Sequence, residues 1–221
     1  MMQDQAAQLD ELLSHARRLM ERGHYVYTEP LLRRLVAHRI PAAFGLLGDL
    51  LRIGFAPGAG AEPSAVYRLY AEGDGLGDLQ ATVGLSRCYG RGVGCDRDEA
   101  RAFALAKKAA DGGSLHGRVI TAQCLLNGFG CEPDPLAALP YLEAIVDEEI
   151  PGLLYSLGYI LMIDEDGYPR EPERAAALFE RAARAGSDEA CYALASIAHH
   201  AGNDTEAAGW IAFLHNRIPQ S

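Results

Sequence analysis

Four of the five cysteines recur at one spacing, and this is the first arrangement in the sequence that could do chemistry. Cys88 and Cys95 are followed 36 residues later by Cys124 and Cys131. Thiolates bind zinc well, but one ion needs its donors within about 2.3 Å. Equivalent positions in stacked helices lie about 8–10 Å apart, which is too far for one ion. We therefore expect five free thiols that pack as small apolar side chains, with no metal, cofactor or disulfide framework.

The glycine-rich segment GRGVG at residues 90–94 could be compared with a phosphate-binding loop. A dinucleotide-binding loop requires G-x-G-x-x-G between a strand and a helix. Here the spacing is G-x-G-x-G, and the segment lies between two expected helices. We interpret it as a turn in which glycine permits a positive φ.

The adjacent histidines His199 and His200 are a third candidate, for metal binding. Consecutive residues of a helix point about 100° apart, so the two rings are poorly placed for one ion. Exposed histidines at a helix end are the simpler interpretation. H-E-x-x-H, P-loop and G-x-S-x-G motifs are also absent from the sequence. The sequence thus predicts no catalytic residues and a protein that is not an enzyme.

The cysteines and glycines belong to a longer pattern that repeats every 36 to 38 residues. Each copy reads as a helix, a glycine-rich turn, a second helix and a short turn. One core position recurs in five copies. It is held by Leu47, Leu85, Thr121, Leu157 and Leu194. Because several unrelated features share one period, the chain is predicted to be an array of helix pairs.

Residues that begin and end helices lie where this pattern requires them. Three of the second helices begin with a proline. A proline fits the first turn of a helix, because the N–H that it lacks would have no bonding partner there. The three prolines are Pro63, Pro135 and Pro172. Asp134 is expected to cap one second helix, and Asp96 with Glu99 to form a capping box on the preceding one. Gly113 and Gly186 are expected to end second helices in the left-handed conformation.

The N-terminal residues 1–40 are expected to form a degenerate first pair. Its helices are placed at 6–22 and 29–39, with Thr28 and Pro30 at the start of the second. The last copy also lacks the G-x-G turn. Atypical end copies are expected, because they must present an outer face to solvent.

Three segments of this pattern resemble the Sel-1-like repeat family: CYGRGVGCDRDEARAFALAKKAADGGS, LGYILMIDEDGY and FERAARAGSDEA. The resemblance covers roughly residues 42–216. It implies an all-α fold, a right-handed α/α superhelical solenoid of about six helix pairs with a concave binding face. We expect residues 1–40 and the array at 41–221 to form one continuous domain. The resemblance also implies that the protein is an adaptor or scaffold.

The chain is acidic, with a net charge of −10, and this excludes general binding to nucleic acid. Residues 1–40 carry a net charge of +1 and the remainder −11. The acidic clusters Asp147–Glu149 and Asp164–Asp166 would suit a basic protein partner. The N-terminus does not read as a secretory signal, and the apolar run at 152–163 is too short to span a bilayer. A cytoplasmic location without membrane contact is expected.

A variable position on the first helix of each copy is the candidate binding surface. It lies beside the buried position of Cys88 and is expected to face solvent, on the concave side that the resemblance implies. It is held by Asp49, Arg87, Gln123, Tyr159 and Ser196. Tyr155 and Tyr192 lie one turn earlier, where they could bind a partner or pack between helices. Tyrosine is frequent in binding hot spots.

Two functions follow from these observations. The first is a non-enzymatic scaffold or adaptor that binds a protein partner on its concave face. The second is a bacterial immunity protein that neutralises a secreted toxin by direct binding. Eighteen arginines against two lysines suggest a bacterium with a G+C-rich genome, which keeps the second function open. The oligomeric state and the identity of the partner are left open.

Overall fold

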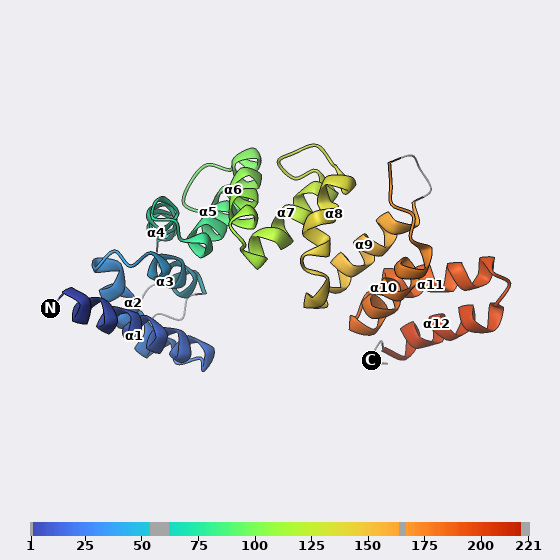
Figure 1. Ribbon diagram of the computed structural model, residues 1–221, viewed down its shortest axis with the longest axis horizontal. Coiled ribbons are helices and arrows are strands. Elements are labelled where there is room, and N and C mark those ends of the chain that lie inside the picture. Colours follow the sequence, from blue (N-terminus) through green and yellow to red (C-terminus); the bar gives the residue numbers. More distant parts are fainter. Residues whose placement is uncertain (1, 54–61, 164–166, 218–221) are drawn as a thin grey trace. The chain divides into compact units, whose positions relative to one another are not determined.

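The computed structural model describes residues 2–53, 62–163 and 167–217 (Figure 1). Within these ranges the regular structure consists of twelve α-helices and one short 3-10 helix, with no strand. Within each compact unit of the chain, consecutive helices pack against one another in an antiparallel arrangement. The predicted all-α fold of about six helix pairs is therefore confirmed.

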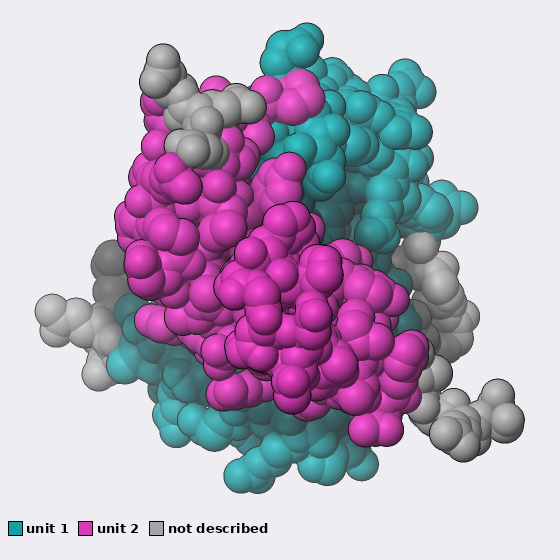
Figure 2. Space-filling model, turned by 90° about the vertical axis from the view of Figure 1, so that its right-hand side faces the viewer, with its two compact units in different colours: residues 1–132 teal, residues 133–221 magenta. Residues whose placement is uncertain are grey.

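The chain forms two compact units, residues 1–132 and 133–221 (Figure 2). The first holds α1 (Met2–Glu21), α2 (Tyr25–Ala37), α3 (Pro41–Ile53), α4 (Pro63–Gly75), α5 (Leu79–Arg91), α6 (Glu99–Asp111) and α7 (Leu115–Asn127). The second holds α8 (Pro135–Glu143), the 3-10 helix η1 (Val146–Glu148), α9 (Pro151–Met162), α10 (Pro172–Ala185), α11 (Asp188–His200) and α12 (Asp204–Arg217). That the two units form one continuous domain stays a prediction.

Most helix starts agree with the sequence pattern. The three prolines open α4, α8 and α10, and the Asp134 carboxylate accepts a hydrogen bond from the Ala137 N–H at 2.9 Å. The capping box at Asp96 was wrong. Asp98, two residues later, directly precedes α6 with its backbone extended, and it caps the helix by accepting from the Arg101 N–H at 2.9 Å.

The first pair differs from its expected boundaries. The second helix begins at Tyr25 rather than at residue 29, so Pro30 lies inside α2. Gly23, at φ +73°, reverses the chain directly after α1, and the His24 N–H donates to the Leu19 carbonyl at 2.9 Å. The chain therefore enters α2 one turn earlier than Thr28 and Pro30 suggest.

The core of the N-terminal unit is organised around Tyr70 of α4. Its side chain is fully buried, and its ring lies against Gly48 of α3 and Gly84 of α5. Asp78 joins the same two helices, because its carboxylate accepts from the Gly45 N–H at 2.8 Å and caps α5 through the Gln80 N–H at 3.0 Å. Burial raises the pKa of Asp78, although these hydrogen bonds oppose the shift. Helices α3 and α5 are thus held at a fixed separation.

The repeated core position is buried in both units. Leu47, Leu85 and Thr121 are buried in the N-terminal unit, and Leu157 and Leu194 in the C-terminal unit. Gly186, at φ +118°, ends α10, and Gly113, at φ +95°, follows the end of α6. The helix register that the period predicts is therefore confirmed.

Candidate partner-binding surface

The seven predicted binding residues lie on first helices of their pairs, three in one unit and four in the other. In the N-terminal unit they are Asp49 on α3, Arg87 on α5 and Gln123 on α7. In the C-terminal unit they are Tyr155 and Tyr159 on α9 and Tyr192 and Ser196 on α11. Gln123, Tyr159, Tyr192 and Ser196 are exposed, whereas Asp49, Arg87 and Tyr155 are half-buried. Each group is described within its own unit.

The tyrosines of the C-terminal unit divide into one supporting ring and two exposed rings. Tyr155 and Tyr159 are one helical turn apart, with ring centroids 6.3 Å apart. The Tyr155 ring also packs on Phe179 of α10 at 5.6 Å, and burial raises the pKa of Tyr155. Tyr159 and Tyr192 are 56% and 57% exposed. Tyr155 therefore fixes the position of Tyr159, while Tyr159 and Tyr192 offer aromatic surface to a partner.

The histidines at the end of α11 make separate local contacts. His199 Nδ1 lies 2.7 Å from the Asp204 carboxylate, whereas His200 Nδ1 lies 2.7 Å from the Ser196 carbonyl oxygen. Among the described residues, no group of three or more histidine, cysteine or acidic side chains could hold a metal ion. Ser196 is exposed beside His200, and its hydroxyl oxygen lies 3.4 Å from His200 Nδ1.

Asp49 is the predicted residue whose role differs most from its expected one. Its Oδ1 accepts from the Tyr70 hydroxyl at 2.8 Å, and its Oδ2 accepts from Gln80 Nε2 at 2.7 Å. Arg52 Nε lies 3.5 Å from the same carboxylate. Burial, reinforced by this carboxylate, raises the pKa of Tyr70. Asp49 therefore supports the core and holds Gln80, and each of its carboxylate oxygens already accepts a hydrogen bond from the protein itself.

Arg87 lines a groove of about 350 Å³ in the N-terminal unit. The groove lies between α5, the turn from α6 to α7 with the first turn of α7, and one residue of α3. Its lining is Asp49, Leu79, Gln80, Val83, Arg87, Gly112, Gly113, Ser114 and His116. Two predicted residues, Asp49 and Arg87, therefore share one groove, while Gln123 lies outside it.

The acidic cluster Asp147–Glu149 lies between α8 and α9. Glu149 forms an ion pair with Arg181 of α10, and Arg181 also donates to the Val146 carbonyl at 2.8 Å. The Asp147 side chain is 97% exposed, and Glu148 is exposed as well. These two carboxylates are available to a partner. The second predicted cluster, Asp164–Asp166, falls outside the described residues.

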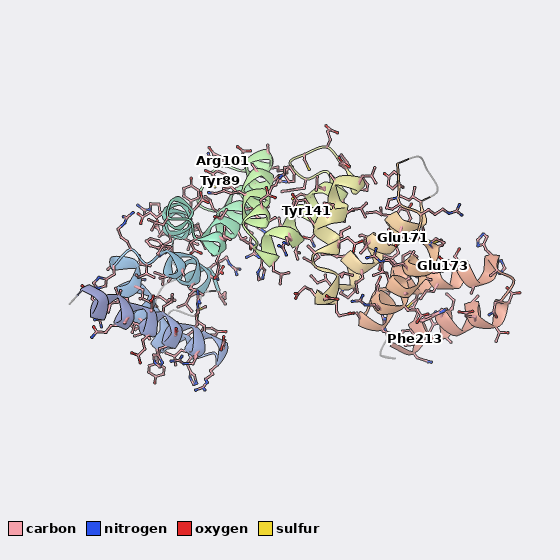
Figure 3. All side chains as sticks on the ribbon, in the orientation of Figure 1. Tyr89, Arg101, Tyr141, Glu171, Glu173 and Phe213 are labelled. Atoms are coloured by element: carbon pink, nitrogen blue, oxygen red, sulfur yellow. The ribbon has the colours of Figure 1, made fainter. Side chains whose placement is uncertain are left out.

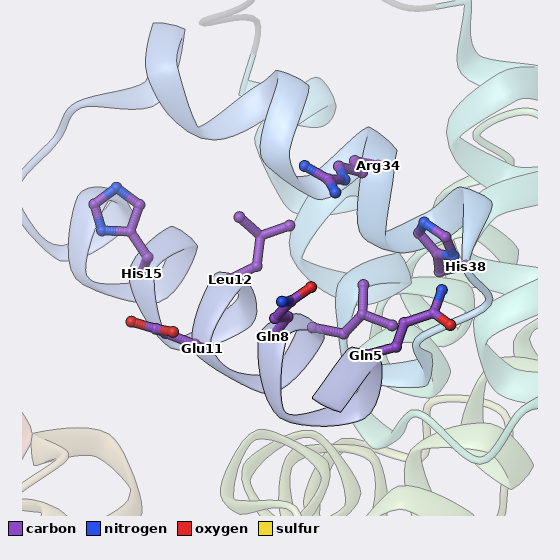
Figure 4. A pocket seen from close by; sticks show the side chains of 8 residues that line it. Gln5, Gln8, Glu11, Leu12, His15, Arg34 and His38 are labelled. Atoms are coloured by element: carbon purple, nitrogen blue, oxygen red, sulfur yellow. The ribbon is translucent and has the colours of Figure 1, made fainter. Parts of the chain in front are cut away.

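Three surface features were not found from the sequence. A hollow of about 710 Å³ lies between α1 and α2, lined by the side chains shown in Figure 4. On α12, Phe213 is exposed beside Trp210, with ring centroids 5.9 Å apart. The Arg101 guanidinium covers the Tyr89 ring at 4.4 Å, where α5 and α6 meet (Figure 3). The hollow and the Arg101–Tyr89 contact depend on packing between helices, which the repeat period does not encode, whereas Trp210 and Phe213 lie one turn apart on the same helix.

The five cysteines are free thiols in the structure. Cys88, Cys124 and Cys191 are buried, and Cys95 and Cys131 are half-buried. Burial is the main cause that raises the pKa of Cys88 and of Cys124 to about 11. Cys88 and Cys124 are therefore neutral thiols near pH 7 and pack as apolar side chains, which agrees with their place in the repeat.

No helix in the described ranges is both long and apolar enough to cross a membrane.

Comparison with known proteins gives one family and a shared fold. The family model described as Sel1 repeat matches residues 79–114, 120–144, 153–187 and 188–208. The crystal structure of a Sel1 repeat protein from Oxalobacter formigenes aligns with a TM-score of 0.70 at 17% identity, over 93% of this chain and 84% of that chain. A protective antigen of uropathogenic Escherichia coli strains, which displays an SLR fold, aligns with a TM-score of 0.71 at 18% identity. That alignment covers 87% of this chain but only 42% of the antigen. At these identities the two structures show the fold alone.

Proposed function

The chain belongs to the Sel1 repeat family, whose repeats mediate protein–protein interactions, and from this premise we propose that it is a non-enzymatic scaffold or adaptor. It binds a protein partner through the exposed residues of its first helices. In the C-terminal unit these are Tyr159, Tyr192 and Ser196, supported by Tyr155. In the N-terminal unit the exposed residue is Gln123, joined by the half-buried Arg87, with Asp49 as a support.

The observation that carries this proposal is the exposure of Tyr159 and Tyr192. Both side chains are more than half exposed, although each lies on a helix whose neighbouring residues are buried in the core. A tyrosine ring loses little conformational entropy on binding and offers both apolar surface and a hydroxyl group. Tyr159 is further held in place by its contact with Tyr155. A pre-positioned ring costs less to bind than a free one.

The charge of the same unit favours a basic partner. Asp147 and Glu148 are exposed to solvent, and Arg181, which pairs closely with Glu149, lies 4.0 Å from the Asp147 carboxylate. Exposed carboxylates contribute mainly to the rate of association and to partner choice. We therefore assign the tyrosines to affinity and the acidic cluster to steering. The proposal places this interaction in the bacterial cytoplasm.

Affinity capture with matched variants tests the proposal. The chain is immobilised and exposed to a lysate of its source, and the retained proteins are identified by mass spectrometry. The test variant combines Tyr159→Ala with Tyr192→Ala. The control is Tyr27→Ala, which removes a tyrosine that is 68% exposed on α2, outside the proposed surface. A partner should be retained by the wild type and the control, and lost with the test variant.

Equal retention by all three proteins would move the binding surface away from these tyrosines. Circular dichroism of each variant shows whether the helices are intact, so that a loss of binding is not confused with unfolding. The toxin-neutralising alternative differs in the identity of the partner. It gains support if the retained protein is a toxin whose activity the chain abolishes.

A further inference from the structure

The groove beside Arg87 has walls of different chemistry. Leu79 and Val83 of α5 supply apolar surface, while Gln80 and Arg87 of the same helix supply polar groups. The opposite wall is the turn from Gly112 to Ser114, which carries little side-chain volume. At about 350 Å³ the groove is near the lower end of the range of about 300–1,000 Å³ that is common for ligand pockets. It suits the end or a short stretch of a peptide rather than a folded surface.

The two charged residues of the groove are not equivalent. The Asp49 carboxylate is engaged on both oxygens by Tyr70 and Gln80, and Arg52 balances its charge. Arg87 is half-buried and forms no ion pair or hydrogen bond with any side chain in the described parts of the chain. The positive charge of Arg87 therefore lacks a partner in the groove, whereas the negative charge of Asp49 already has one. The groove is suited to bind an anion beside Arg87.

Arginine is well suited to that requirement. A guanidinium binds a carboxylate through two parallel N–H donors, and such charge-assisted hydrogen bonds are stronger than neutral ones. Partial burial also reduces the screening that weakens fully exposed ion pairs. His116, exposed on the opposite wall, carries no negative charge that would compete for Arg87. An apolar side chain next to the carboxylate would contact Leu79.

We propose that this groove binds a carboxylate of a partner peptide at Arg87, with the adjoining apolar side chain of the peptide against Leu79 and Val83. The inference deepens the proposed function, because it assumes that the protein binds another polypeptide. The carboxylate is either the C-terminus of the partner or an acidic side chain within it. Both have the same chemistry, and the experiment separates them.

Three N-acetylated peptides of defined composition serve as probes. The first is Ala-Ala-Leu with a free C-terminal carboxylate, and the second is the same peptide as its C-terminal amide. The third is Ala-Leu-Glu-Ala as its amide, which carries the acid inside the chain. Each is titrated into the full ¹⁵N-labelled protein, and NMR follows the Arg87 Nε–Hε signal and the backbone amides of Gln80, Val83 and His116.

At least one acidic peptide should bind at least about tenfold more tightly than the neutral amide, as expected for a charge-assisted hydrogen bond. Arg87→Gln should reduce its affinity about tenfold, to the level of the neutral peptide. The control Arg91→Gln removes an exposed arginine of the same helix that does not line the groove, and should leave the affinity unchanged. The tighter of the two acidic peptides identifies the source of the carboxylate.

Equal affinity for the acidic and neutral peptides would overturn the proposal. So would an Arg87→Gln variant that binds like the wild type, or groove signals that no acidic peptide shifts in a saturable way. An unchanged amide spectrum outside the groove shows that Arg87→Gln is folded. The peptide titration uses free peptides and not the captured partner, so the two tests are independent. A negative titration does not affect the capture experiment with the tyrosine variants, and a negative capture experiment does not affect the titration.

Discussion

One added methyl group at Gly84 should destabilise the N-terminal unit, because the space beside this glycine is filled by the Tyr70 ring. An alanine Cβ at position 84 would lie 2.3 Å from Tyr70 Cε1 and 2.4 Å from Cδ1. Favourable carbon contacts lie at about 3.5–4.0 Å, so the ring would have to move by about 1 Å. The ring cannot move freely, since it is fully buried and also lies against Gly48.

The expected magnitude follows from three contributions. Overpacking of a core costs about 1–3 kcal/mol. Displacement of the ring also breaks the hydrogen bond from the Tyr70 hydroxyl to the Asp49 carboxylate, which contributes about 1.5–3 kcal/mol. Alanine is the better helix former by about 0.5–1 kcal/mol, which offsets part of the loss. Gly84→Ala should therefore lower the free energy of unfolding by about 2–5 kcal/mol.

Urea unfolding monitored by far-UV circular dichroism measures this change. Gly209→Ala is the control, because a Cβ at this helical position has nothing within 4 Å, and it should be neutral or stabilising by up to about 1 kcal/mol. In a Tyr70→Leu background, which removes the ring, Gly84→Ala should cost much less. The reasoning is refuted if Gly84→Ala is neutral in the wild type, or if its cost is the same with and without the Tyr70 ring.

Three further predictions concern the core, a helix cap and the thiols. Leu157→Ala removes a side chain that is 1% exposed and should cost about 2–5 kcal/mol in urea unfolding, whereas a cost below about 0.5 kcal/mol would show that the register is wrong. Asp98→Ala should cost about 0.5–2 kcal/mol in the same assay, because it removes the cap of α6. Asp96→Ala should change stability by less than about 0.5 kcal/mol. A larger loss for Asp96→Ala than for Asp98→Ala would support the capping box at Asp96 instead. Burial first, and a neighbouring thiol second, raise the pKa of Cys88 and Cys124 to about 11. At pH 8 their alkylation should therefore be much slower in the native protein than in urea, as quantified by mass spectrometry; equal rates in the two conditions would contradict the burial argument.

The repeat period was enough to predict the helix pairs and their register. Leu157 and Leu194 are buried, as expected for a position that stays mostly leucine from copy to copy while its neighbours on the helix vary. The proline rule also holds at Pro135, since a missing N–H has the same effect in any sequence context. Asp96 and Asp98 show where such rules fail. Both aspartates can cap a helix, and the choice depends on the backbone conformation of the turn, which local sequence does not encode.

The candidate surface could be predicted only in part. Exposure of Tyr159 and Tyr192 follows from helical periodicity, because their neighbours on the helix are core residues. The role of Asp49 does not follow, since its partners Tyr70 and Gln80 lie 21 and 31 residues away in the sequence. The groove beside Arg87 likewise joins three helices and one turn. Such features arise from packing between pairs and become visible only in three dimensions.

The affinity of the captured partner for Tyr159→Ala tests the central claim most directly. Surface plasmon resonance should show a loss of at least about 2 kcal/mol, the usual threshold of a binding hot spot, with Tyr27→Ala equal to the wild type. Reversal of charge at Asp147 and Glu148 should mainly slow association, and more strongly at low salt. Wild-type affinity of a folded Tyr159→Ala variant would contradict the account and place the interface away from the first helices.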